Sequence, residues 1–136
     1  MTPTKQEAAN RYVIMVVRPY LESGERLIKS FIGKQYVPFI KMAFLGVISE
    51  IAAPWYCFTL TQKHVVLMKM NNLMKPVEIK RIPFEGIESV RFQKSIWGDL
   101  CSVGFMKERP LVLRVSHGYR SQVESIVSVL MNRNPK

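Results

Sequence analysis

The sequence predicts a mostly β fold of the α+β class, in which seven short antiparallel strands form a small barrel and a C-terminal helix caps it. Three observations favour this fold. Apolar and polar residues alternate in short runs between residues 27 and 115, which is the period of half-buried strands. Turn-forming residues separate these runs. An amphipathic run follows the last strand at residues 119–132, and its apolar face is suited to covering one end of a barrel.

Length and composition fit one domain with a core of its own. A chain of 136 residues is long enough to bury a core without the help of a metal or a disulfide. The hydrophobic fraction of 48% and the mean hydropathy of +0.04 exclude wholesale disorder. We expect a helical extension at residues 1–22, the β domain at residues 23–132 and a disordered tail at residues 133–136.

The N-terminal residues predict a helix. Thr4 and Glu7 have the spacing of a capping box, and apolar residues then recur every three or four positions up to about Arg18. We expect Pro19 to end or kink the helix. Its apolar side either covers one face of the sheet or forms a contact between subunits.

The first strand is predicted at residues 27–36, after turn chemistry at residues 22–25. The next segment, residues 37–53, carries an apolar helical stripe that Lys41 and Glu50 interrupt. Three interpretations fit it: a helix or loop packed on the sheet, an element in a membrane interface, or a membrane-spanning helix. Its apolar run is shorter than the roughly 20 residues that a span needs.

The hairpin at residues 55–70 is the clearest β signal. Two runs rich in aromatic and β-branched residues flank a polar tetrad at residues 61–64. Asn71 and Asn72 are expected to supply positive φ in the following turn, and the break in alternation at Arg81 predicts a bulge there. The remaining strands are predicted at residues 76–84, 87–92, 100–106 and 111–116.

The last helix is predicted from about residue 119 to residue 132. Ser121 and Glu124 have the spacing of an N-terminal cap. One apolar stripe runs along the helix, and it consists of Tyr119, Val123, Ile126, Val127, Leu130 and Met131.

This order of elements resembles that of a pleckstrin-homology (PH) barrel, in which a helix plugs one open end of two near-orthogonal antiparallel sheets. Residues 24–131 are similar to bacterial PH-like domains of the YokE type. The similarity rests on Gly24-Glu25 before the first strand, on the aromatic run, turn threonine and aliphatic strand at residues 56–68, and on Ile-Pro-Phe-Glu-Gly-Ile-Glu-Ser-Val at residues 82–90. Gln62 and His64 stand where the family carries an acidic residue and an arginine. The resemblance implies a binding or assembly module.

Catalytic and metal-binding patterns are scarce in the sequence. It has two histidines, His64 and His117, and a single aspartate, and it lacks a Gly-rich phosphate loop, an HExxH pair and a CxxC motif. Cys57 and Cys101 lie in apolar runs, where a thiol is usually buried and inert, and their spacing to the histidines is not that of a zinc site. We therefore expect no enzymatic activity, no cofactor and no metal.

The charge of the chain points to an anionic partner. Its 20 Lys and Arg residues against 10 acidic residues give a net charge of +10. No basic cluster of the phosphoinositide-binding type occupies residues 37–53, and the aromatic residues do not interleave with basic ones as a nucleic-acid platform requires, so we expect neither ligand. The candidate binding surface consists of Lys34, Lys41, Phe44, Lys63, His64, Lys69, Lys75, Lys80, Arg91, Lys94 and Arg114.

Two functions of different classes fit these observations. The first is a non-enzymatic module for protein interaction or self-assembly in the bacterial cytoplasm, which offers an edge strand to a partner or to a second copy and forms a homo-oligomer. The alternative is a peripheral module at the inner face of the membrane, where residues 37–53 and adjacent basic side chains bind anionic lipid. Two cysteines and the lack of a signal-peptide pattern favour a reducing compartment without secretion.

Overall fold

The computed structural model describes residues 4–36 and 53–133 of the chain. The helices are α1 (Lys5–Val17) and α4 (Arg120–Arg133), with short 3-10 helices η1 (Arg18–Tyr20), η2 (Phe84–Gly86) and η3 (His117–Tyr119). The strands are β1 (Leu27–Gln35), β2 (Trp55–Thr61), β3 (Val65–Met70), β4 (Pro76–Ile82), β5 (Ile87–Gln93), β6 (Asp99–Phe105) and β7 (Leu111–Val115). The predicted fold class, mostly β with a C-terminal helix, is confirmed.

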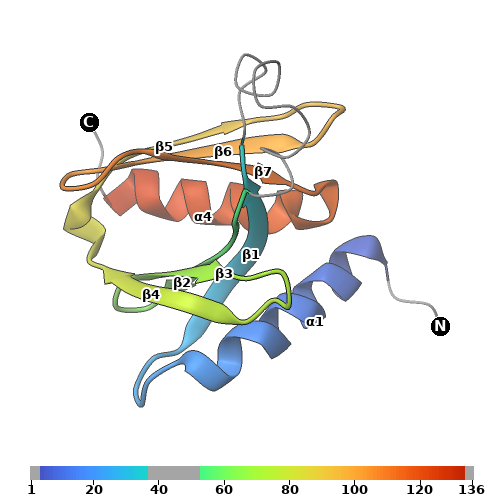
Figure 1. Cartoon of the computed structure of the whole chain (residues 1–136). Coiled ribbons are helices and arrows are strands. Elements are labelled where there is room, and N and C mark those ends of the chain that lie inside the picture. The colour runs from blue at the N-terminus through green and yellow to red at the C-terminus, as the bar shows by residue number, and fades with distance from the viewer. Residues whose placement is uncertain (1–3, 37–52, 134–136) are drawn as a thin grey trace.

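All seven strands belong to one antiparallel sheet with the order β4-β3-β2-β1-β7-β6-β5. The sheet folds over so that β2, β3 and β4 form one layer and β5, β6 and β7 another (Figure 1). Strand β1 joins the layers because it pairs with β2 along its length and with β7 at its C-terminal end. The two sheets expected from the resemblance are therefore one continuous hydrogen-bonded sheet, and β4 and β5 are its ends.

Close approach of β1 and β7 requires a glycine at residue 33. Gly33 pairs with Val115, and a Cβ atom at this position would lie 3.0 Å from the Cβ atom of Leu113 and 3.2 Å from the carbonyl oxygen of Arg114. A larger residue would push the two strands apart at the point where the layers meet.

Helix α4 packs against β1 and β5 and closes one end of the core. Its buried residues Val123, Ile126 and Leu130 belong to the same hydrophobic cluster as Phe31 and Phe58. The two phenylalanine rings are stacked, with centroids 5.4 Å apart and planes at 18°. The predicted apolar stripe is thus buried for most of its length, although Met131 is 55% exposed.

Helix α1 begins at the predicted cap, where the Glu7 N–H donates to Thr4 Oγ1 at 3.1 Å. It packs on β1 and β2 through the fully buried Val13 and Val17. Of the two roles weighed for its apolar side, cover of the sheet is confirmed.

Three local predictions were wrong. The bulge predicted at Arg81 lies at Val77 instead, because Lys69 pairs with Glu78 and Met70 pairs with Pro76. From residue 78 the strand alternates regularly, and Glu78 and Lys80 line a polar pocket. The alternation of apolar and polar residues had predicted that these two side chains face solvent.

The other two errors concern a turn and a helix cap. Among the described residues the positive φ after β3 belongs to Met74, because Asn71 builds the turn with its side chain, which accepts from the N–H groups of Leu73 and Lys75. Helix α4 continues directly from η3, whose N-cap is Ser116, so Ser121 lies inside α4 and does not cap it.

Within residues 4–36 and 53–133 no helix has the length and apolar character needed to cross a membrane. The three interpretations of residues 37–53 concern a segment that, except for Ala53, lies outside the described ranges, and they stay predictions.

Candidate functional site

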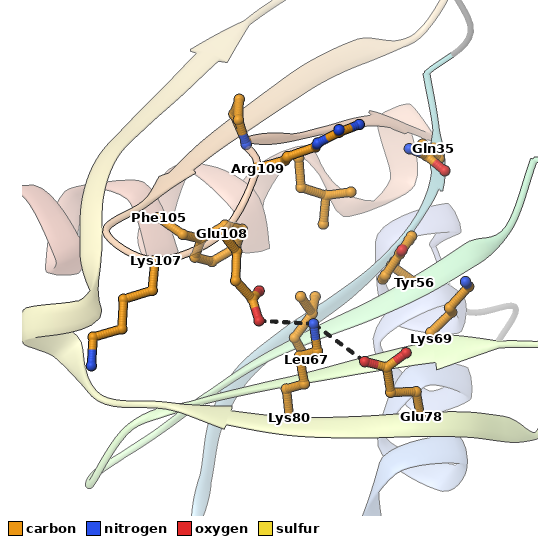
Figure 2. A pocket seen from close by; sticks show the side chains of 12 residues that line it. Gln35, Tyr56, Leu67, Lys69, Glu78, Lys80, Phe105, Lys107, Glu108 and Arg109 are labelled. Atoms are coloured by element: carbon orange, nitrogen blue, oxygen red, sulfur yellow. Dashed lines mark hydrogen bonds and ion pairs between the residues drawn. The ribbon is translucent and has the colours of Figure 1, made fainter.

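A pocket of about 470 Å³ opens between the two layers of the sheet. Figure 2 shows it bounded by β4 on one side and by the β6–β7 connection on the other. We call it the inter-layer pocket. Its lining includes four cationic side chains, Lys69, Lys80, Lys107 and Arg109, and two carboxylates, Glu78 and Glu108, so a positive charge prevails.

Lys80 is held in place across the mouth of this pocket. Its Nζ atom lies 2.9 Å from Glu108 Oε1 and 3.2 Å from Glu78 Oε1. The hydrogen bond to Glu108, followed by that to Glu78, raises the pKa of Lys80 above its ordinary value. Figure 2 shows the contact between Lys80 and Glu108 joining β4 to the β6–β7 connection, while Glu78 lies on β4 beside Lys80. Lys80 therefore links β4, at one end of the sheet, to the β6–β7 connection of the other layer.

Three cations of the pocket remain available to a ligand. Lys69, Lys107 and Arg109 make no ion pair or side-chain hydrogen bond within the part of the chain that the structure describes. Tyr56 lines the same pocket, and burial raises its pKa, so its hydroxyl stays protonated and able to donate. These groups suit a carboxylate or another oxyanion.

A second hollow, of about 450 Å³, lies beside α1 and the β5–β6 turn. We call it the aromatic groove. Trp55, Trp97, Tyr12 and Tyr119 line it together with two cationic residues, and no acidic residue contributes to its lining. Lys34 Nζ lies 5.6 Å from the ring centroid of Trp55, and the Arg114 guanidinium lies 5.4 Å from that of Tyr36. Both cations thus stack on aromatic rings.

The structure brings together two pairs of the predicted site residues. Lys69 and Lys80 meet in the inter-layer pocket, and Lys34 and Arg114 meet in the aromatic groove. The others do not join these clusters. Lys63, Lys75 and Arg91 are exposed, Lys94 pairs with Glu124 at 3.3 Å, His64 lies in a structural cluster, and Lys41 and Phe44 lie outside the described residues.

His64 belongs to a cluster that fixes the turn before β1. Glu25, with a side chain only 2% exposed, contacts His64 and accepts from Arg81 Nε at 3.0 Å and Nη2 at 2.9 Å. Arg81 also donates to the carbonyl of Tyr20 at 3.1 Å. The hydrogen bonds from Arg81 lower the pKa of Glu25 from 4.5 to about 2. The cluster ties η1 and the turn before β1 to β4.

Gln62 strengthens the same junction. It accepts from the Arg26 N–H at 2.7 Å and donates to the Gly24 carbonyl at 2.5 Å. Gln62 and His64, the two residues that depart from the PH-like pattern, therefore both anchor the β2–β3 turn to the segment that precedes β1.

Asp99 holds the start of α4. Its fully buried carboxylate accepts from Arg120 Nε at 2.8 Å and Nη2 at 2.7 Å, and from the Ser95 N–H at 3.1 Å. The Arg120 hydrogen bonds keep the pKa of Asp99 below its ordinary value. His117 Nε2 donates to the Ser95 carbonyl at 2.7 Å. The aspartate and the second histidine thus have structural partners.

The cysteines are buried as predicted. Burial raises the pKa of the Cys57 thiol to about 11 and that of Cys101 to about 12, so neither forms an appreciable amount of thiolate at neutral pH. Among the described residues no group of three His, Cys, Asp or Glu side chains is placed to hold a metal ion.

Sequence reasoning found Lys69 and Lys80 of the inter-layer pocket and missed the other residues that line it. The predicted binding surface left out Lys107, Glu108 and Arg109 of the β6–β7 connection, and Tyr56 of β2. The available signal was the run of charges at residues 107–109, because charged connections next to a sheet edge often line a site.

Comparison with known proteins shows a likeness of fold. No family model and no curated protein sequence matches the chain. The hSac2 domain from human phosphoinositide phosphatase Sac2 has a TM-score of 0.57 at 10% identity, over 96% of this chain and 83% of that one. The C-terminal domain of an unknown protein from Leishmania infantum has a TM-score of 0.49 at 16% identity, over 93% and 95%. The likeness to the hSac2 domain shows a shared fold. The second TM-score is below 0.5, and nothing is inferred from that likeness.

Proposed function

We propose that the chain is a non-enzymatic binding module, related to the bacterial PH-like domains, whose inter-layer pocket receives an acidic segment of a partner protein. One observation carries the proposal: Lys69, Lys107 and Arg109 line this pocket without a carboxylate partner among the described residues, while Lys80 is already neutralised by two glutamates. An acidic side chain entering the pocket gains charge-assisted hydrogen bonds that no group of the described chain supplies.

The strand edges support the proposal less than the pocket does. β4 and β5 are the ends of the sheet, and each carries a one-residue bulge, at Val77 and at Glu88. Charged residues stand along both strands. Bulges and charges are the devices by which proteins prevent edge pairing. We therefore place the proposed contact at the pocket.

Photo-crosslinking followed by titration tests this function. A photoreactive phenylalanine analogue in place of Tyr56 samples the pocket, and the same analogue in place of Tyr20 samples a surface away from it. We expect a protein captured in cells from the first position and absent from the second. That protein is then purified and titrated against the unmodified chain by calorimetry.

Charge-removing variants decide the result. The double variant Lys69→Gln with Arg109→Gln is expected to bind the captured protein at least about tenfold more weakly, which is about 1.4 kcal/mol. The control Lys29→Gln removes an exposed charge that does not line the pocket and leaves the affinity unchanged. Equal affinities of both variants, or capture of no protein from position 56, would refute the proposal.

Self-assembly and the membrane alternative remain open to direct tests. Sedimentation of the purified chain at micromolar concentration measures whether it forms the homo-oligomer expected from the sequence. The lipid-binding role of residues 37–53 stays a prediction, because Lys41 and Phe44 lie outside the described residues.

A further inference from the structure

Three large apolar side chains project into water at two turns. Ile96 is 83% exposed, Trp97 is 82% exposed and Leu73 is 79% exposed, the highest values for large apolar residues in the described part of the chain. Leu73 lies in the β3–β4 turn, and Ile96 and Trp97 lie in the β5–β6 turn. Exposed apolar groups usually mark an interaction surface where they form part of one face. We call these three residues the apolar tips.

Both turns border the aromatic groove. Met74, next to Leu73, lines the groove, and Trp97 lines it too. Figure 1 places the two turns on the side of the molecule where α4 begins. The apolar tips and the groove therefore form one face, which shares no lining residue with the inter-layer pocket.

The charge of this face is positive. Lys34 and Arg114 lie in the groove, and Lys75 follows the β3–β4 turn. Arg114 lies directly beside the β5–β6 turn, because a Cβ atom added to Gly98 would be 3.1 Å from Arg114 Cγ. The lining of the groove contains no carboxylate to neutralise these cations.

We propose that this face docks on an anionic membrane surface, with Leu73, Ile96 and Trp97 entering the interfacial layer and Lys34, Lys75 and Arg114 meeting the acidic headgroups. Tryptophan is a residue that membrane interfaces favour, because its ring is apolar while its N–H remains able to donate. Basic side chains around the apolar groups add attraction to the acidic lipids.

The shape of the face favours a membrane over the other anionic partners. The apolar tips project from two separate turns, and a soft, extended surface accepts both at once. Two of the three tips are aliphatic and offer no ring for a nucleic-acid base to stack on. A second copy docking face to face would place the same cations opposite each other.

Vesicle binding of the full-length chain tests the proposal. The probes are vesicles of phosphatidylglycerol and phosphatidylcholine, and vesicles of phosphatidylcholine alone. We expect co-sedimentation with the anionic vesicles only, weakening as salt is raised. Brominated lipid is expected to quench the fluorescence of Trp97, which is separated from that of Trp55 by comparison with Trp97→Phe.

Matched variants locate the contact. The double variant Ile96→Ser with Trp97→Ser is expected to lower vesicle binding at least about tenfold, and its fold is preserved because both side chains are exposed. The control Met106→Ser with Met131→Ser removes two exposed apolar groups that do not line the groove or flank its turns, which are 61% and 55% exposed, and leaves binding unchanged.

Several results would overturn the proposal. These are no binding to anionic vesicles at low salt, equal binding of the Ile96/Trp97 variant and the wild type, or a similar loss in the Met106/Met131 control. Quenching of Trp97 by an acidic peptide or a single-stranded oligonucleotide, without any by lipid, would assign the face to a different partner. The pocket variant Lys69→Gln with Arg109→Gln is expected to keep full vesicle binding, so this test is separate from that of the proposed function.

Discussion

Acid is expected to weaken the fold through Glu25. The folded state binds a proton at this carboxylate with a pKa of about 2, against an ordinary value of 4.5. The stabilisation is therefore complete above pH 5 and is lost as the pH falls from about 4.5 to about 2. The difference between these pKa values corresponds to roughly 3 kcal/mol. Because Arg81 is 26% exposed and water screens the pair, we expect about 2 kcal/mol.

Urea unfolding between pH 2 and pH 7 measures this contribution. At pH 7 the variant Glu25→Gln is expected to be about 2 kcal/mol less stable than the wild type, and the difference closes as the pH approaches 2. Glu22→Gln is the matched control, because Glu22 also contacts Arg81, at 3.6 Å, but is 68% exposed. It is expected to cost less than about 0.5 kcal/mol. A difference between Glu25→Gln and the wild type that is the same at every pH would contradict the reasoning.

The remaining predictions concern stability and thiol reactivity. Asp99→Ala leaves the Ser95 N–H and Arg120 without their acceptor and is expected to cost about 2 kcal/mol in urea unfolding; a loss under about 0.5 kcal/mol would show that Asp99 does not hold α4. Val13→Ala removes fully buried methyl groups and is expected to lower the free energy of unfolding by about 2 kcal/mol. Met15→Ala, on the exposed side of α1, is expected to change it little, and equal effects would mean that α1 does not pack as described. Cys57 and Cys101 are expected to resist a thiol reagent in the folded protein and to react fully in urea; rapid labelling without denaturant would contradict their burial.

Local patterns predicted most of the fold. The β2–β3 hairpin was readable because its signals lie within residues 55–70: two β-rich runs, and a threonine whose hydroxyl accepts from the N–H groups of Lys63 and His64. The N-terminal helix was readable because its cap and its apolar spacing are also local. Such features depend on residues that are close together in the sequence, so the spacing of residue types is enough to predict them.

The candidate site depended on contacts between distant residues. Lys80 meets Glu108, which is 28 positions away, and Arg81 meets Glu25, which is 56 positions away. Neither pairing leaves a periodic trace in the sequence. The alternation rule also failed at Glu78 and Lys80, because it assumes an apolar interior, and here the inward side of β4 lines a polar pocket. His64 was taken for a free surface cation because the glutamate that it contacts precedes β1.

The position of β1 between the layers has a consequence for how the protein is made. Its pairing with β7, through Gly33 and Val115, closes a loop that includes most of the chain, and closure of so long a loop is slow compared with hairpin formation. During synthesis β1 to β4 emerge first and can pair, while Phe31 and Phe58 remain exposed until β5, β6, β7 and α4 complete the core. The nascent chain is therefore prone to aggregation until α4 leaves the ribosome.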